Sequence, residues 1–242
     1  MSNRISTYII FSEQEQARRT QLQKIQEYFA DLTIVDAIFP SMVRVPFLER
    51  LIAKSKERTG TALLENEIGV LMSHRKVWHE IVLKAKDPNM HYLVLESDSK
   101  VKNIQLIEKY YHQIQSKFDL FFWGAWNGNA TIRHSTKIIL EKGVEIGEPM
   151  IKSIYGAYGY SINANGAKYM LKKSAKIAYP VDLYKHYVNL KELKVGVIQP
   201  EQIGTWLTTD STIRIESKSA LLKRNLIIKI FNCRNKIHAY FC

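Results

Sequence analysis

The feature that most constrains the fold is an alternation between short apolar runs and longer segments with helical spacing. The apolar runs are rich in β-branched and aromatic residues, as in Thr7-Tyr8-Ile9-Ile10-Phe11, which predicts buried strands. Between them, apolar residues recur every three or four positions, which predicts amphipathic helices. Strands that alternate with helices predict an α/β domain with a sheet covered by helices on both faces.

The predicted elements follow one another without a Pro-, Gly- or Ser-rich linker as far as residue 213. The strands are expected at 7–11, 32–39, 91–95, 118–125, 155–162 and 195–198. The helices are expected at 13–30, 65–86, 103–116 and 165–175. Residues 41–62 are predicted to be a loop-rich insertion, and residues 127–150 a hairpin or loops. We therefore predict one domain over residues 1–213 and a separate basic segment over 214–242.

The C-terminal segment 214–242 holds half of the excess positive charge. It carries seven basic residues and one acidic residue, whereas the whole chain has a net charge of +12. Its apolar residues Leu222, Leu226 and Ile230 have helical spacing, which predicts an amphipathic helix that binds an anionic membrane surface. The alternative is a helix packed on the rest of the protein, and truncation after Thr212 separates the two.

The composition excludes several classes of protein. Cys233 and Cys242 are the two cysteines of the chain, so a disulfide scaffold is excluded and a reducing compartment is favoured. No secretory signal pattern is visible at the start, and no apolar run approaches the ~20 residues that cross a bilayer. We expect a soluble or peripheral protein. A nucleic-acid-binding protein is disfavoured because the positive charge gathers in one terminal segment.

Two carboxylates follow the predicted strand at 91–95. Side chains alternate along an extended chain, so Glu96 and Asp98 are expected on one side and Ser97 on the other. In open α/β sheets, ligands bind at the carboxyl ends of strands. Two carboxylates there repel each other unless a cation joins them, and Mg²⁺ and Mn²⁺ prefer such oxygen ligands. This predicts a divalent-cation site, with a solvated turn as the alternative.

The predicted helix 65–86 carries Glu67 and His74 on nearly the same flank of its apolar face. A carboxylate and an imidazole at that edge can orient a ligand, although a histidine satisfied inside the core is the alternative. Trp78, on the same helix, is interpreted as a core residue. Gly156 and Gly159 flank Tyr158 in a segment suited to a strand, where glycine often marks close approach of a ligand or of backbone.

These segments, in this order, resemble glycosyltransferase family 25, of the lipooligosaccharide galactosyltransferase type. The resemblance covers roughly residues 5–213. The matching pieces are Arg18-Arg19, Asp36-Ala37, Glu67-Ile68-Gly69-Val70-Leu71-Met72-Ser73-His74 with Trp78, Leu93-Val94-Leu95-Glu96-Ser97-Asp98, Gly156 to Asn163 with Gly166-Ala167, and Pro180-Val181-Asp182.

The resemblance implies a GT-A-like nucleotide-sugar-binding domain that transfers galactose from UDP-galactose with inversion. The acceptor would be a lipooligosaccharide, a lipopolysaccharide or a related bacterial surface glycan or glycolipid. The cofactor would be Mn²⁺ or Mg²⁺ held by Glu96 and Asp98. The enzyme would be cytoplasmic and peripheral at the inner face of the cytoplasmic membrane. The implied donor-binding residues are Arg18, Glu67, His74, Glu96, Asp98, Gly156 and Tyr158.

Ser97 departs from the family, in which an acid occupies the centre of the triplet. If Ser97 points away from the cation, Ser97→Asp is expected to change turnover by less than about threefold. If the central acid is required, the protein would instead be a non-catalytic member that binds a nucleotide-sugar or a glycan. A basic nucleic-acid-binding protein is the remaining alternative.

Sugar transfer also requires a base that deprotonates the acceptor hydroxyl, and a carboxylate suits that task. Asp182, after Pro180, is our candidate, with Glu201 and Asp210 as rivals. A helix N-cap is the structural alternative for Asp182.

Overall fold

The five residues of β1 (Thr7–Phe11) alternate between two hydrophobic cores, and this alternation sets the layers of the fold. Tyr8 and Ile10 belong to one buried cluster, and Ile9 and Phe11 to the other. The sheet therefore has apolar faces on both sides, and helices cover both. The structure is a computed structural model that describes residues 5–125 and 128–206.

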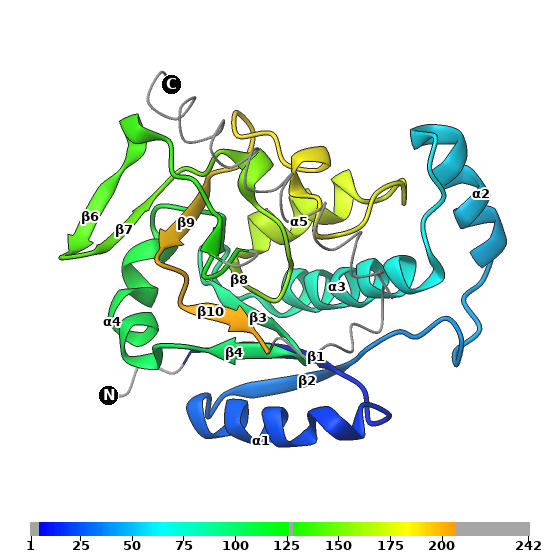
Figure 1. Cartoon of the computed structure of the whole chain (residues 1–242), viewed down its shortest axis with the longest axis horizontal. Helices are drawn as coiled ribbons and strands as arrows, with labels where there is room; N and C mark the ends of the chain where they lie inside the picture. The colour runs from blue at the N-terminus through cyan, green and yellow to red at the C-terminus, as the bar shows by residue number, and fades with distance from the viewer. Residues whose placement is uncertain (1–4, 126–127, 207–242) are drawn as a thin grey trace, which may run out of the picture.

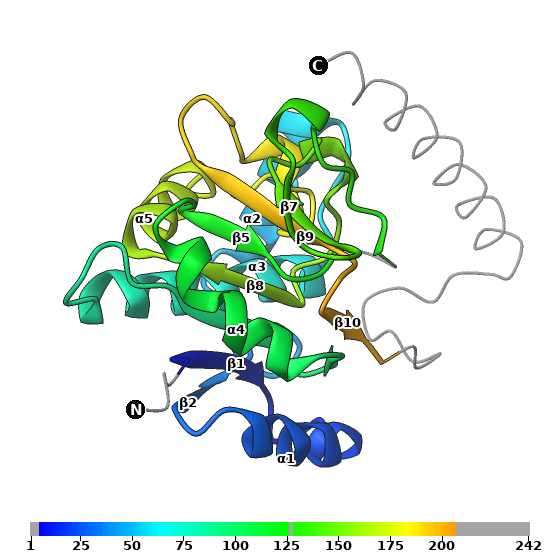
Figure 2. The same ribbon diagram turned by 90° about the vertical axis from the view of Figure 1, so that its left-hand side faces the viewer.

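Eight strands form one mixed sheet in the order β2-β1-β3-β8-β5-β9-β7-β6, and most of this order is visible in Figure 2. β1 is parallel to both neighbours, whereas β8 is antiparallel to β3 and β5. A separate two-stranded sheet pairs β4 with β10 antiparallel. The bounds are β2 Leu32–Asp36, β3 Tyr92–Glu96, β4 Ser99–Val101, β5 Leu120–Phe122, β6 Ile138–Glu141, β7 Val144–Gly147, β8 Gly159–Ile162, β9 Val195–Gln199 and β10 Ile203–Thr205.

The helices divide between the two faces of the sheet (Figure 1). α3 (Glu65–Lys84) and α5 (Ala164–Lys173) pack together and contribute to the cluster that holds Tyr8 and Ile10. α1 (Arg19–Tyr28) and α4 (Ile104–Gln115) contribute to the cluster that holds Ile9 and Phe11. Among the described residues, no helix is both long and apolar enough to cross a membrane. The predicted α/β domain with a helix-covered mixed sheet is confirmed.

Residues 41–62 contain a helix that the sequence prediction placed in a loop-rich insertion. α2 (Leu48–Thr59) has a short apolar stripe, Leu48, Leu51 and Ile52 at helical spacing, but these side chains are only partly buried and Ser55 is its one buried residue. Its C-terminal signal is Gly60, whose φ of 78° is the left-handed conformation that favours glycine. The prediction was wrong because it took the mixed charges, Pro46 and Gly60 as signs of a loop and passed over this short stripe.

Three predicted strands are shorter than expected, and two short strands were not predicted. The strand expected at 32–39 ends at Asp36. The strand expected at 118–125 is paired over Leu120–Phe122, and the strand expected at 155–162 begins at Gly159. Gly156 has a φ of 87°, so the chain turns before the strand begins. β4 and β10 have three residues each and form through a long-range pairing that local periodicity cannot reveal.

His91, just before β3, gives a prediction about acid stability. Its ring is fully buried between the Phe118 carbonyl (Nε2 to O, 2.7 Å) and the Ser161 hydroxyl (Nδ1 to Oγ, 3.2 Å). Burial lowers the pKa of His91 from 6.5 to about 4. As the pH falls through this window, the unfolded chain binds a proton that the folded protein does not, so stability decreases by about 3 kcal/mol.

This contribution is measured by comparison with His91→Gln, which keeps a donor and an acceptor without a titrating ring. We expect urea unfolding to show a wild-type advantage at about pH 7 that shrinks towards about pH 4.5. A difference between the two proteins that does not change with pH would contradict the assignment.

The sheet order brings the turn after β1 and the turn after β3 together at one edge of the sheet. β1 and β3 are parallel neighbours, with Ile10 opposite Glu96, so their carboxyl ends meet. The turn after β1 contains a 3-10 helix, η1 (Gln16–Arg18), and the turn after β3 contains Ser97 and Asp98. Carboxyl ends of neighbouring strands are where α/β sheets bind ligands, so this edge is the candidate site.

Candidate functional site

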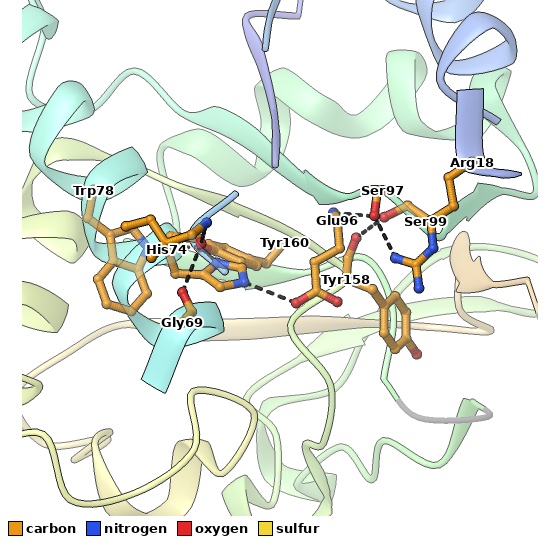
Figure 3. A network of polar contacts seen from close by, with 11 residues as sticks. Arg18, Gly69, His74, Trp78, Glu96, Ser97, Ser99, Tyr158 and Tyr160 are labelled. Atoms are coloured by element: carbon orange, nitrogen blue, oxygen red, sulfur yellow. Dashed lines mark hydrogen bonds and ion pairs between the residues drawn. The ribbon is translucent and has the colours of Figure 1, made fainter. Parts of the chain in front are cut away.

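Glu96 and Ser97 point to opposite sides of the β3 end (Figure 3). Glu96 contacts His74 on the α3 side, with 3.1 Å between Oε1 and Nε2. Ser97 contacts Arg18 and Glu15 on the other side. Ser97 is 4% exposed, so its hydroxyl is committed to these contacts. The alternation expected from the sequence places Ser97 away from Glu96.

Asp98 has a buried carboxylate without a hydrogen-bond partner on Oδ1 among the described residues. Burial and the nearby charge of Glu96 raise the pKa of Asp98 to about 7, and the guanidinium of Arg18 partly opposes this increase. Glu96 and Asp98 are therefore close enough to repel each other, and Arg18 offsets only part of that repulsion. This arrangement has the electrostatic character of a cation-binding or proton-binding site.

Glu96 is held by a chain of buried side chains that crosses from α3 to β8. His74 and Trp78 lie four residues apart and share one face of α3. Tyr160 lies opposite Val94 in the β3–β8 pair. Val94 precedes Glu96 by two residues, so Tyr160 and Glu96 lie on the same face of the sheet. The Tyr160 hydroxyl lies 2.9 Å from His74 Nδ1 and 2.8 Å from Trp78 Nε1. All three side chains are at most 1% exposed.

The chemistry of Trp78 sets the direction of these hydrogen bonds. An indole N–H can only donate, so the Tyr160 oxygen accepts from Trp78. The Tyr160 hydroxyl hydrogen is then donated to His74 Nδ1, and Nε2 carries the hydrogen that His74 donates to Glu96. Both ring nitrogens of His74, the Tyr160 hydroxyl and the Trp78 indole nitrogen therefore have partners, and one oxygen of Glu96 receives a fixed hydrogen bond. His74 thus acts on the site through Glu96.

The other residues of the Glu67–His74 segment secure the start of α3. Glu67 closes a capping box by accepting the N–H of Leu64 at 2.9 Å. Gly69 allows close approach of the preceding loop, because a Cβ there would lie 2.4 Å from the Ile38 carbonyl oxygen. Ser73 accepts the N–H of Ile38 at 2.8 Å. Glu67 therefore lies at the helix start, whereas His74 reaches the site.

Arg18, Ser97 and Glu15 form a closed ring of contacts on the opposite side of the triplet. Arg18 Nη1 donates to Ser97 Oγ at 2.6 Å and pairs with Glu15 Oε1 at 2.9 Å. The Ser97 hydroxyl donates to Glu15 Oε2 at 2.9 Å. The side chains of Arg18 and Glu15 are 20% and 12% exposed. The positive charge of Arg18 therefore lies next to the two carboxylates without an ion pair to either of them.

Tyr158 and Glu201 form the wall next to this site. The Tyr158 hydroxyl donates to Glu201 Oε2 at 3.1 Å, and Glu201 also pairs with Lys102. The Tyr158 ring leaves no room for a side chain at Gly156, since a Cβ there would lie 2.6 Å from Tyr158 Cε1. The Gly128 N–H also donates to Glu201 at 3.0 Å. Glu201 thus joins three segments, which gives it a structural task alongside its candidacy as the base.

Asp182 lies in the turn before the short helix η5 (Tyr184–His186), whose N-cap is Leu183. The helix N-cap alternative for Asp182 is therefore wrong. Burial raises the pKa of the Tyr184 phenol well above its usual range, and the charges of Glu96 and Asp182 add to this increase. Asp210 lies outside the described residues, as does the basic segment 214–242.

The residues present were compared with the requirements of Mg²⁺ or Mn²⁺. Within residues 5–125 and 128–206, no group of three or more His, Cys, Asp or Glu side chains is arranged to hold a metal ion. These hard cations are commonly held by one or two carboxylates, with water and substrate phosphates as the other ligands. The unpartnered oxygen of Asp98, beside Glu96, fits that second arrangement.

The sequence predictions did not identify Glu15 and Tyr160. Glu15 precedes Arg18 by three residues, an acid–base spacing that was readable within the predicted helix 13–30. Tyr160 is an aromatic residue in a predicted strand, and such residues are ordinary in strands, so nothing local marked it. Both act through contacts with residues more than 75 positions away.

Comparison with known proteins identifies a family that the chain matches. A family model described as glycosyltransferase family 25 (LPS biosynthesis protein) matches residues 4–184 of the chain. No curated protein matches the chain. The matched range includes Glu15, Arg18, His74, Glu96 and Asp98, and it ends just after Asp182.

Proposed function

The chain belongs to glycosyltransferase family 25, a family of LPS biosynthesis, and we propose that it transfers galactose from UDP-galactose, with inversion, to a lipooligosaccharide or lipopolysaccharide acceptor. Membership of the family makes the protein a glycosyltransferase that uses a sugar donor and a glycan acceptor. The identity of the sugar, the GT-A-like character of the domain and the stereochemistry are parts of the proposal.

The observation that carries the proposal is the pair Glu96 and Asp98 at the carboxyl end of β3. A nucleotide-sugar donor brings a diphosphate whose negative charge increases as the sugar leaves. Two neighbouring carboxylates are an unfavourable neighbour for that diphosphate, unless a divalent cation lies between the carboxylates and the phosphates. We therefore propose that Glu96 and Asp98 would hold Mn²⁺ or Mg²⁺. The bound ion would supply charge neutralisation for the diphosphate.

The protein side chains have separate tasks in this proposal. His74, held by Tyr160, orients Glu96 through a donated hydrogen bond. Arg18 supplies a positive charge to the diphosphate from the side of Ser97. Asp182 is the proposed base that accepts the proton of the acceptor hydroxyl, with Glu201 as the rival. Gly156 and Tyr158 shape the wall of the donor site.

The location of the protein is also a proposal. We propose that it is cytoplasmic and that segment 214–242 holds it at the inner face of the membrane. The supporting observation is the sequence of that segment, with seven basic residues interspersed among apolar residues at helical spacing. An acceptor assembled on a lipid would then be kept near the enzyme.

A screen of UDP-sugars tests the proposed function. We expect one UDP-sugar, UDP-galactose, to be turned over in the presence of Mn²⁺, with UDP release that stops when EDTA is added. The product formed on a short sugar acceptor gives the linkage, and its anomeric configuration tests inversion. Matched reactions with Ca²⁺ separate a specific requirement from a general effect of divalent charge.

The outcomes separate this proposal from the alternatives. Turnover that ignores EDTA would contradict the cation site. Binding of UDP or a UDP-sugar without any transfer would favour the non-catalytic family member that the serine at position 97 permits. Salt-sensitive binding of RNA would favour the nucleic-acid alternative.

A further inference from the structure

Arg18 is a cation next to two repelling carboxylates, yet it does not pair with them. Its hydrogen bond to Ser97, the residue between Glu96 and Asp98, places the guanidinium at the end of β3. Its ion pair is nevertheless with Glu15, at 2.9 Å, and its short hydrogen bond is with Ser97, at 2.6 Å. An arginine side chain is long and has several rotamers, so some interaction must retain it on the Ser97 side.

Glu15 provides that interaction through both carboxylate oxygens. Oε1 forms the ion pair with the Arg18 guanidinium, and Oε2 accepts the hydrogen bond from the Ser97 hydroxyl. The Ser97 hydroxyl uses its hydrogen for Glu15 and a lone pair for Arg18, so each member of the ring contacts the other two. Glu15 itself is fixed by the turn after β1, where its N–H donates to the Ser12 carbonyl at 2.9 Å.

The ring leaves part of the guanidinium open. Arg18 uses Nη1 for both contacts, and among the described residues Nε and Nη2 have no hydrogen-bond partner. A guanidinium presents five N–H donors in a plane, and its free edge matches the oxygens of a phosphate group. Arg18 is held at Ser97, next to Asp98 in the sequence, and the proposed function requires the donor diphosphate at this end of β3.

We propose that Glu15 is a positioning residue of the donor site, which retains Arg18 beside Ser97, keeps the guanidinium off Asp98 and leaves its free edge open to a nucleoside diphosphate. Without Glu15, Arg18 would pair with Asp98 and neutralise the carboxylate that the site needs. This inference rests on the proposed function, because it assumes that a nucleoside diphosphate binds at this edge of the sheet.

The ring also explains how serine can occupy position 97. The local carboxylate that balances Arg18 comes from position 15, so position 97 needs only a hydroxyl. An aspartate at 97 would face the Glu15 carboxylate, since Ser97 Oγ lies 2.9 Å from Glu15 Oε2. The near-neutral effect expected for Ser97→Asp from the sequence therefore does not follow from this geometry. The substitution should be tolerated when the charge at position 15 is removed.

The experiment is calorimetric binding of UDP with Mn²⁺ to the full chain. We expect Glu15→Gln and Ser97→Asp each to weaken UDP binding about tenfold, and the double variant to return to within about threefold of the wild type. The matched control is Glu13→Gln, which breaks a neighbouring glutamate–arginine pair, Glu13 with Arg19, on the exposed surface. This control should bind UDP as the wild type does.

The results distinguish positioning from a structural role. A purely structural Glu15 would lower the melting temperature, and Ser97→Asp would not rescue it; that outcome overturns the inference. Wild-type affinity in Glu15→Gln also overturns it and leaves the proposed function intact. Failure of the wild-type protein to bind UDP removes the proposed function and this inference with it. If Glu15→Gln does not fold, Ser97→Ala serves instead, with an expected loss of about threefold; unchanged binding there contradicts the ring.

Discussion

Asp98→Asn is expected to reduce sugar transfer by at least about 100-fold, a change of about 2.7 kcal/mol in the barrier. The amide keeps the shape of the side chain but removes the negative charge that would hold the cation. The structure adds a second expectation, on stability. Because burial and Glu96 raise the pKa of Asp98 to about 7, the charged pair costs the apo protein free energy at neutral pH. The apo variant should therefore melt no lower than the wild type.

The prediction for Asp98→Asn is specific because activity should fall while the stability of the apo protein should not. UDP release with Mn²⁺ gives the activity, and a thermal melt without metal gives the stability. Glu96→Gln should impair transfer less or equally, because Glu96 already accepts a hydrogen bond from His74. Full activity of Asp98→Asn would refute the proposed cation site. A strong loss of stability would instead show that the Asp98 carboxylate has a structural role.

Tyr160→Phe is expected to cost the fold about 2–5 kcal/mol, although it removes one oxygen atom. The change leaves the indole N–H of Trp78 and the Nδ1 of His74 without their present partner, in a core where both side chains are 0% exposed. Each unsatisfied buried group has its own desolvation cost. Activity should fall as well, since His74 then loses the hydroxyl that fixes its orientation towards Glu96.

Urea unfolding measures the cost of Tyr160→Phe, and Tyr110→Phe is its matched control. The Tyr110 hydroxyl donates to Glu141 at 2.8 Å beside the exposed Lys109–Glu141 ion pair, so its loss should cost less than about 1 kcal/mol. If the two substitutions have equal effects, the buried hydrogen-bond chain does not contribute as the structure indicates. Restoration of the wild-type value by Tyr160→Phe with Trp78→Phe is not expected, because His74 would still lack its donor.

Several elements of the fold were predictable because their causes are local. The five apolar residues of β1, the helical spacing along α3 and the Asn163 side chain that caps α5 all act within a few neighbouring positions. The opposite directions of Glu96 and Ser97 were predictable for the same reason, since alternation of side chains is a property of the extended backbone, whereas Asp98 lies in the turn after β3. The family resemblance to glycosyltransferase family 25 was also carried by short local motifs, and it is confirmed.

α2 is an element that local sequence patterns did not predict. Its apolar residues Leu48, Leu51 and Ile52 have helical spacing, but the stripe is short, only partly buried and surrounded by charged residues, so it is a weak signal. The separate β4–β10 sheet depends on a pairing between residues about 100 positions apart. Apolar periodicity within a short stretch of sequence does not reveal such a long-range pairing.

The sequence alone determined which residue types stand after β1, in α3 and after β3, because residue identity and local periodicity need no partner. The tertiary structure decided what each of them does. The parallel pairing of β1 with β3 brought Glu15 and Arg18 to Ser97, and the packing of α3 on β8 brought His74 to Tyr160. These contacts join residues 79 and 86 positions apart, and their distances depend on the whole sheet order. A hydrogen bond requires tenths of an ångström, which no pattern in the sequence specifies.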